Sequence, residues 1–279
     1  MDAERLSRDR LSQGPVTVVA EISCNHMGDP IAALGLIAVA KDAGADVVKL
    51  QCYTPDELCD PEDGRTFASG PWKGRRLYDL YTEAQTPREW FPDLIAYCRE
   101  IGIPWFSSVF SPDGVRFLEG LDCPVYKIAS QDVDDMNLWR AIRATGKPIV
   151  ASDGCRSSLQ GHRLPDIALR CVSEYPAPLS GYGLKHPPQH SAWGLSLHTV
   201  SALPAIVAVA KGAVMVEAHL MLAGTTPLDQ HHSFTPAHFH DLVKQIRYAE
   251  MVLGNGDPRS LNTSLRRRQV NGRMVRSLV

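Results

Sequence analysis

The stretch that decides the fold is Trp193–Met221, which reads WGLSLHTVSALPAIVAVAKGAVMVEAHLM. Two short hydrophobic runs flank an apolar segment of helix length, and this strand–helix–strand pattern requires two parallel strands that are neighbours or nearly so. Each strand is expected to end in a polar cluster that contains a histidine: Ser196 and His198 on the first, and Glu217 and His219 on the second. Because parallel strands end on the same rim of a sheet, we expect the two imidazoles to share one site.

The rest of the chain repeats this alternation. The strand-like runs are Val16–Ile22, Val47–Leu50, Trp105–Val109, Val125–Ile128, Ile149–Ala151, Ile167–Val172, Trp193–Leu197 and Val214–Val216. The helical segments are Pro30–Ala43, Pro87–Ile101, Pro112–Leu121, Met136–Thr145, Val200–Ala210 and Pro236–Leu253. Several begin with Pro and end at Gly, which are the usual start and stop signals of a helix.

Eight such runs predict an α/β fold of the (β/α)8 TIM-barrel type over residues 1–254, and the ~250 residues typical of that fold suit this chain. The connections Cys155–Pro165 and Pro176–Ala192 are too short or too rich in Pro and Gly for full helices, so two shortened helices are expected. Residues 255–279 are expected to be a basic tail or linker remnant. A doubly wound open sheet is the alternative, disfavoured because no Gly-x-Gly-x-x-Gly motif follows the first run.

Composition restricts the partners. With a formal net charge of −2 over 279 residues, the chain as a whole has no excess of positive charge that would indicate binding to nucleic acid or to an anionic membrane. No apolar run approaches the ~20 residues that span a bilayer, and the charged segment Met1–Gly14 lacks a secretory signal. The seven cysteines, without a Cys-x-x-Cys spacing, are typical of free thiols in a reducing compartment. We therefore expect a cytoplasmic protein acting on small molecules.

Polar groups end every predicted strand, where a barrel places its chemistry. Lys49 and Lys127 lie within apolar runs, and a lysine is seldom buried without a partner. Each could pair with a structural Glu, but we favour two ammonium groups that hold an anion in the barrel mouth. Hydroxyl donors at neighbouring strand ends would suit a ligand with phosphate and carboxylate groups, and the long loop Cys52–Arg75 is expected to be a mobile cover over the rim.

His198 and His219 are then expected to bind a divalent metal and to leave positions open for water and a substrate oxygen. The candidate further ligands or acid–base groups are Glu21, Asp132, Glu217 and Asp229. An anion site beside an open metal site predicts carbon–carbon bond chemistry on a phosphorylated acid.

Six segments carry a resemblance to a known family: AEISCNHMGD (20–29), VVKLQ (47–51), YKIAS (126–130), YPAP (175–178), GLSLHT (194–199) and EAH (217–219). In order and place they resemble the motifs of the sialic acid synthase family, which condenses phosphoenolpyruvate with an aldehyde sugar. The resemblance covers nearly the whole chain. It implies attack by C3 of phosphoenolpyruvate on the aldehyde, addition of water at C2 and loss of phosphate, which gives a 2-keto-3-deoxy acid.

The resemblance also implies roles. His198 and His219 match the ligands of a manganese or magnesium ion. The residues that match the phosphoenolpyruvate site, with the neighbouring Gln51, are Lys49, Gln51, Ser108, Lys127, Ser130, Ser152, Ser173 and Ser196. The residues that fall near the acceptor and its reacting groups are Glu21, Asp132, Tyr175 and Asp229.

The chain departs from the family pattern at several positions. Leu197 replaces an Asp, Ala218 a basic residue and Ser173 an Asn, while Asp132 stands near the place of a Glu. The antifreeze-like second domain is also expected to be missing, and because members pair through both domains, a homodimer is an open expectation. We therefore expect an acceptor that is smaller than, or different from, N-acetylmannosamine.

The sequence is also compatible with two other functions. One is a Schiff-base aldolase with Lys127 as nucleophile. The other is a non-catalytic barrel that binds phosphoenolpyruvate.

Overall fold

Eight parallel strands close into a barrel in the order β1 to β8 in a computed structural model that describes residues 6–154, 159, 161–186, 192–255, 268–270 and 273–275. The strands are β1 (Thr17–Glu21), β2 (Val47–Cys52), β3 (Trp105–Val109), β4 (Tyr126–Ile128), β5 (Ile149–Asp153), β6 (Ile167–Arg170), β7 (Trp193–Leu197) and β8 (Met215–His219). The predicted TIM barrel is confirmed, and the closed sheet excludes the doubly wound alternative.

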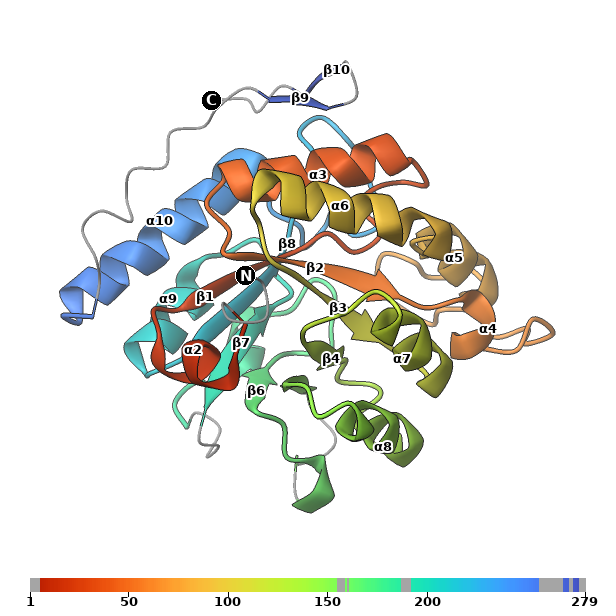
Figure 1. Cartoon of the computed structure of the whole chain (residues 1–279), viewed down its shortest axis with the longest axis horizontal. Coiled ribbons are helices and arrows are strands. Elements are labelled where there is room, and N and C mark those ends of the chain that lie inside the picture. The colour runs from red at the N-terminus through yellow and green to blue at the C-terminus, as the bar shows by residue number, and fades with distance from the viewer. Residues whose placement is uncertain are drawn as a thin grey trace.

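The helices lie around the outside of the barrel, except the first, whose Leu11 packs against the barrel interior (Figure 1). They are α2 (Arg8–Gln13), α3 (Pro30–Asp42), α4 (Pro55–Leu58), α5 (Leu77–Ala84), α6 (Phe91–Ile101), α7 (Pro112–Glu119), α8 (Met136–Ala144), α9 (Leu203–Ala210) and α10 (Pro236–Val252). Helices α3 and α7 begin at a proline, as predicted, and each is capped by the residue before it. The side chain of Asp29 accepts a hydrogen bond from the Ile31 amide before α3, and that of Ser111 accepts one from the Gly114 amide before α7. The sequence reasoning missed α2, α4 and α5.

Two hydrophobic layers result. One fills the space between the strands and the surrounding helices. The other lies inside the barrel, where Val19, Val47, Phe106 and Leu169 pack together, and Leu6 and Leu11 at the chain's start join it. These two leucines close one end of the barrel, so the open end is the rim at which the strands finish.

The connections after β5 and β6 contain only short 3-10 turns in their described parts, η2 (Gly161–Arg163) and η3 (Leu179–Tyr182). The prediction of shortened helices therefore agrees with these parts. Cys155 lies outside the described residues, as does most of 255–279, where only an antiparallel pair of strands is described, β9 (Arg268–Val270) and β10 (Arg273–Val275). The predicted nature of that segment stays a prediction.

No helix in the described part of the chain combines the length and the apolar character needed to cross a bilayer.

Gly194 shows how tightly the barrel interior is packed. A Cβ atom on Gly194 would lie 2.3 Å from the carbonyl oxygen of Met215 and 2.7 Å from Cδ2 of Leu169. The carbonyl belongs to the neighbouring strand β8, which pairs with Gly194 and cannot shift without disturbing the ladder.

We predict that Gly194→Ala lowers the free energy of unfolding by about 1–3 kcal/mol, because overpacking forces the backbone apart. Urea denaturation followed by circular dichroism measures this. Gly64→Ala is the matched control: its Cβ would meet no atom within 4 Å, and its φ does not lie in the left-handed region. Equal stability of the two variants would contradict the packing argument.

Candidate functional site

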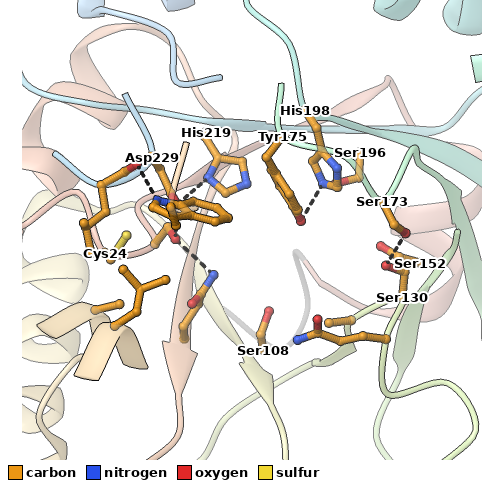
Figure 2. Close-up of a pocket in the computed structure, with 18 of the residues that line it drawn as sticks. Cys24, Ser108, Ser130, Ser152, Ser173, Tyr175, Ser196, His198, His219 and Asp229 are labelled. Atoms are coloured by element: carbon orange, nitrogen blue, oxygen red, sulfur yellow. Dashed lines mark hydrogen bonds and ion pairs between the residues drawn. The ribbon is translucent and has the colours of Figure 1, made fainter. Parts of the chain in front are cut away.

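One pocket of about 850 Å3 opens at the carboxyl ends of the strands. The residues that the sequence nominated and that line it are Lys49, Gln51, Ser108, Lys127, Ser130, Ser152, Ser173, Tyr175, Ser196, His198, Glu217, His219 and Asp229. Figure 2 shows Asp229 and His219 on one side of this pocket and Ser130, Ser152 and Ser173 on the other, with His198 beside Ser196 between them. The remaining two nominated residues, Glu21 and Asp132, are not part of its wall.

The two buried lysines lie beside two buried carboxylates. The Lys49 ammonium forms an ion pair with Glu21 and lies 3.5 Å from Oε1 of Glu217, and it donates to Oγ of Ser108 at 2.6 Å. The Lys127 ammonium donates to Oγ of Ser152 at 2.7 Å but comes only within 3.8 Å of Glu217. The buried ion pair weighed as the lesser possibility is thus present at Lys49, while both ammonium groups also face the pocket.

This arrangement shifts the ionisation of all four groups. Burial opposes the charge on Lys49, but Glu21 and Glu217 offset it and raise the pKa of Lys49. Burial also opposes the charge on Lys127, and the attraction of Glu217 offsets this effect only partly, so the pKa of Lys127 is lowered. Burial also opposes the charge on Glu217, yet Lys127 and Lys49 lower its pKa to about 2. Lys127 is therefore the less neutralised cation and the one better placed to bind an added anion.

Glu21 lies beneath the pocket and is fully buried. Its Oε1 accepts from the Ser23 amide at 2.6 Å, and its register on β1 places it between Lys49 and His219. Burial raises its pKa above the ordinary value of a glutamate. In this position Glu21 forms an ion pair with Lys49 and is not part of the pocket wall, so its predicted catalytic role stays a prediction.

A hydroxyl cluster lies at the end of the pocket near Lys127. The Oγ atoms of Ser130 and Ser173 are 2.9 Å apart. Gly154 makes this approach possible, because a Cβ there would lie 2.5 Å from Oγ of Ser173 and 2.6 Å from Cβ of Ser130. Ser108, Ser130, Ser152 and Ser173, from four strand ends, all line this pocket, and Gly154 is a residue that the sequence reasoning did not single out.

The imidazole of His198 is fixed by a hydrogen bond between its Nδ1 atom and the backbone. Its Nδ1 lies 2.5 Å from the Val172 carbonyl oxygen, so Nδ1 carries the proton and Nε2 faces the pocket. Nε2 is 3.4 Å from the hydroxyls of both Ser196 and Tyr175, and the Tyr175 ring stacks on the imidazole at 4.2 Å. Burial, with the nearby His219, lowers the pKa of His198 to about 3, so the ring is neutral.

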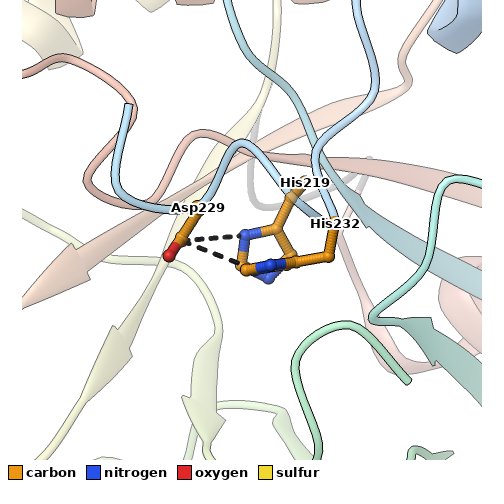
Figure 3. Close-up of side chains that lie close together, drawn as sticks. All are labelled: His219, Asp229 and His232. Atoms are coloured by element: carbon orange, nitrogen blue, oxygen red, sulfur yellow. Dashed lines mark ion pairs between the residues drawn. The ribbon is translucent and has the colours of Figure 1, made fainter. Parts of the chain in front are cut away.

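His219 lies next to Asp229 and His232, as Figure 3 shows. Nδ1 of His219 is 3.2 Å from Oδ2 of Asp229, and Nε2 of His232 is 3.8 Å from the same oxygen. The centroids of the two imidazole rings are 4.6 Å apart, whereas those of His198 and His219 are 6.0 Å apart. Among the described residues, this trio has a donor geometry that fits a metal ion.

The sequence reasoning missed His232 because it lies in a polar loop, 13 residues beyond His219. The loop turns back along β8: the Phe234 amide donates to the His219 carbonyl at 2.8 Å, and the Met221 amide donates to Phe234 at 3.0 Å. The two consecutive histidines soon after Asp229 could have marked this loop as a candidate part of the site. Nothing in the local sequence, however, shows that the loop folds back beside β8.

The segment around Trp72 covers the mouth of the pocket. Thr66 and Arg76 form an antiparallel bridge, and the Trp72 indole nitrogen donates to the Leu228 carbonyl at 3.2 Å. Trp72 also lies against Tyr175, with ring centroids 5.9 Å apart. The long loop after β2 therefore lies over the rim, where the sequence placed it.

Comparison with known proteins gives consistent results. The family model described as the NeuB family matches residues 36–258. A pseudaminic acid synthase of Campylobacter jejuni subsp. jejuni serotype O:2 is 36% identical over 86% of this chain and 76% of its own, and one of Helicobacter pylori is 34% identical over 94% and 82%. The crystal structure of an N-acetylneuraminic acid synthetase of Leptospira borgpetersenii superposes with a TM-score of 0.74, at 24% identity over 88% of this chain and 87% of the other.

Asp132 gives a test of the electrostatics at the rim. Its Oδ2 atom is buried without a hydrogen-bond partner, and burial, with Asp135 nearby, raises its pKa from 3.8 to about 7. The folded protein therefore binds a proton that the unfolded chain has lost, so the free energy of unfolding falls as pH rises from about 4 to about 7.

We predict that Asp132→Asn stabilises the protein relative to the wild type by about 1–2 kcal/mol more at pH 8.5 than at pH 5, after allowance for partial exposure. Thermal and urea unfolding at the two pH values measure the difference. The control Glu100→Gln changes an exposed carboxylate on α6. A pH-independent effect of Asp132→Asn would contradict the raised pKa.

Proposed function

This chain belongs to the NeuB family, and on that premise we propose that it is a phosphoenolpyruvate-dependent synthase that joins phosphoenolpyruvate to an aldehyde or aldose. The product would be a 2-keto-3-deoxy acid, with inorganic phosphate released. The observation that carries the proposal is one pocket with an incompletely neutralised ammonium group and hydroxyls on one side, and histidines and an aspartate of the kind that ligate metals on the other.

The phosphate and carboxylate of phosphoenolpyruvate fit the side that holds Lys127. Ammonium groups and hydroxyls are donors that such anions bind. Ser130, Ser152 and Ser173 supply the hydroxyls around that charge, while Lys49 and Ser108 extend the donor set along the floor. We propose that Ser196 and Gln51 complete the site where this anion meets the acceptor.

The proposed reaction forms one carbon–carbon bond and one carbon–oxygen bond, and it breaks one carbon–oxygen bond; of the two protons that water supplies, one ends on the former aldehyde oxygen and the other leaves with the phosphate or the solvent. C3 of phosphoenolpyruvate attacks the aldehyde carbon, and the aldehyde oxygen takes a proton to become a hydroxyl. Water adds its oxygen to C2, and the C2–O bond to phosphate breaks, which leaves a ketone at C2. Asp132 is our proposed proton-transfer group: it directly follows the pocket residues Ser130 and Gln131, from which a water molecule can connect it to the substrate, and a carboxyl whose pKa is about 7 suits general acid–base work near neutrality.

A divalent cation, Mn2+ or Mg2+, supplies polarisation of the aldehyde carbonyl when bound. His198 and His219 are the residues that the motifs nominate to hold it. Tyr175 and Asp229 lie beside these histidines and are proposed to orient the acceptor sugar.

The acceptor is proposed to resemble that of the pseudaminic acid synthases rather than N-acetylmannosamine, because those relatives cover most of this chain at more than a third identity. The departures at Leu197 and Ala218 do not argue for a non-catalytic barrel. Both side chains are buried in the layer between barrel and helices and line no part of the pocket.

One observation favours a second candidate, a Schiff-base aldolase. An amine must be neutral to attack a carbonyl, and burial lowers the pKa of Lys127 in that direction. Borohydride trapping of pyruvate on Lys127 would support this reading, whereas loss of turnover on chelation would support the synthase.

We predict that Lys127→Ala raises the phosphoenolpyruvate concentration needed for half-saturation by roughly 100-fold, the effect of losing a charged hydrogen-bond donor of about 3 kcal/mol. Calorimetric titration with phosphoenolpyruvate checks this. Lys211→Ala, a change of an exposed lysine after α9, is the control. Unchanged binding by Lys127→Ala would remove that residue from the anion site.

We predict that the protein releases phosphate from phosphoenolpyruvate only when a suitable aldehyde sugar and Mn2+ are both present. A phosphate-release screen over a panel of hexoses, acetamido sugars and diacetamido sugars checks this. Release without any sugar would indicate a phosphatase, and binding of phosphoenolpyruvate without release under every condition would support the non-catalytic reading.

A further inference from the structure

We infer that Trp72, on the long loop after β2, is a specificity-determining residue whose indole packs against one face of the acceptor sugar. The inference rests on the proposed function for the class of that ligand, an aldose. It goes beyond the position of the loop over the rim, because it gives the indole a direct contact with a substrate and states which face of a sugar that contact selects.

Trp72 is the tryptophan that the hydrophobic core does not use. All five tryptophans of the chain lie among the described residues. Trp105, Trp139 and Trp193 are buried in the layer between the strands and the helices, and Trp90 packs against that layer. Trp72 belongs to neither hydrophobic layer, is half-buried and lines the pocket. A large apolar ring outside the core is free to contact a ligand, and tryptophan is enriched at such contacts.

The segment that carries Trp72 is a hairpin with its own hydrogen bonds. The Phe67 amide donates to the Arg75 carbonyl at 3.0 Å, and the Gly74 amide donates to the Phe67 carbonyl at 2.8 Å. Gly70 and Gly74 have φ values of 79° and 82°, in the left-handed region that favours glycine. Phe67 lies edge-on to Trp72, with ring centroids 5.6 Å apart. The hairpin therefore sets the position of the indole before a ligand binds.

Two contacts hold the indole on the acceptor side of the pocket. Its Nε1 donates to the carbonyl of Leu228, which directly precedes Asp229, and its ring centroid lies 5.9 Å from that of Tyr175. The serines of the anion side lie across the pocket from Asp229 (Figure 2). An acceptor bound beside Tyr175 and Asp229 therefore lies next to the indole, whereas phosphoenolpyruvate bound at Lys127 does not.

Space for a ligand adjoins the indole. A second cavity, of about 590 Å3, lies beside the main pocket. The residues that belong to the walls of both cavities are Cys24, Pro71, Trp72 and Leu228. The second cavity also has polar side chains in its wall, among them Arg75 and Gln230. A ligand larger than the three-carbon phosphoenolpyruvate therefore has room beside Trp72, with hydrogen-bonding groups further along.

The chemistry of a sugar explains the use of an indole. The hydroxyls of an aldose point mainly outwards, which leaves C–H groups on one face, and packing that face on an aromatic ring removes apolar surface from water. A hydroxyl directed at the ring would lose its water without gaining a partner, because the indole N–H is already bonded to Leu228. Trp72 therefore selects a sugar whose contacting face carries C–H groups rather than hydroxyls.

The test measures sugar binding to the full chain in the presence of MnCl2, first without and then with phosphoenolpyruvate. The probes are individual hexoses, acetamido sugars and diacetamido sugars, followed by calorimetry and by tryptophan fluorescence. We expect Trp72→Ala to weaken binding of the tightest sugar by roughly 30-fold and to reduce the preference among sugars. Trp72→Phe keeps an aromatic ring and should weaken binding less. The change in emission that the sugar causes in the wild type should be absent from both variants.

Two controls separate contact from structural support. Trp90→Phe changes a tryptophan that packs on the outer layer and lines no part of the pocket, so it should keep wild-type sugar binding and the change in emission. Calorimetric titration with phosphoenolpyruvate should give the same affinity for Trp72→Ala as for the wild type. If circular dichroism shows that Trp72→Ala does not fold, Trp72→Leu serves, because it keeps apolar volume without a flat ring.

The inference is overturned if the folded Trp72 variants bind every sugar as tightly as the wild type, or if no sugar changes the emission of the wild type. An equal loss of phosphoenolpyruvate and sugar affinity would also overturn it, since that result indicates a structural role. Failure of the proposed synthase is distinguishable. Sugar binding that depends on Trp72 without phosphate release would refute the reaction alone, and phosphate release with an unchanged KM for the sugar in Trp72→Ala would refute the contact alone.

Discussion

The ion pair between Lys49 and Glu21 is the interaction on which the rim depends. Both side chains are almost fully buried, and Glu217 lies within reach of Lys49 and Lys127. Removing one member of such a group leaves an uncompensated charge in the interior, which costs several kcal/mol. The two ammonium groups are therefore held at fixed positions on neighbouring parts of the barrel mouth, and the site is organised before any ligand arrives.

The two halves of the pocket follow from this arrangement in different ways. The anion side is built from strand ends, so its serines and lysines have little freedom once the barrel has closed. The histidine side depends on loops: the segment after β8 returns to place Asp229 and His232 beside His219, and the segment around Trp72 covers them. Strand ends suit the binding of a common substrate fragment, and loops suit variation in the acceptor.

Much of this could be predicted from the chain itself. Alternating apolar runs and helical segments identified the barrel, because a parallel strand order needs a crossover after each strand. The buried lysines and the strand-end serines could be assigned to one pocket because all parallel strands finish at the same rim. The motifs that placed the chain among the sialic acid synthases are confirmed by its membership of the NeuB family.

What the sequence alone determined is thus the barrel, the end at which its pocket opens and a set of side chains that line that pocket. Only the tertiary structure decided that Glu21 lies beneath the pocket, that Leu197 and Ala218 face the outer layer, and that His232 joins His219. The reason is physical. Strand direction and periodicity are local properties that a sequence displays, whereas the return of a loop depends on backbone hydrogen bonds between segments that approach only after the barrel has closed.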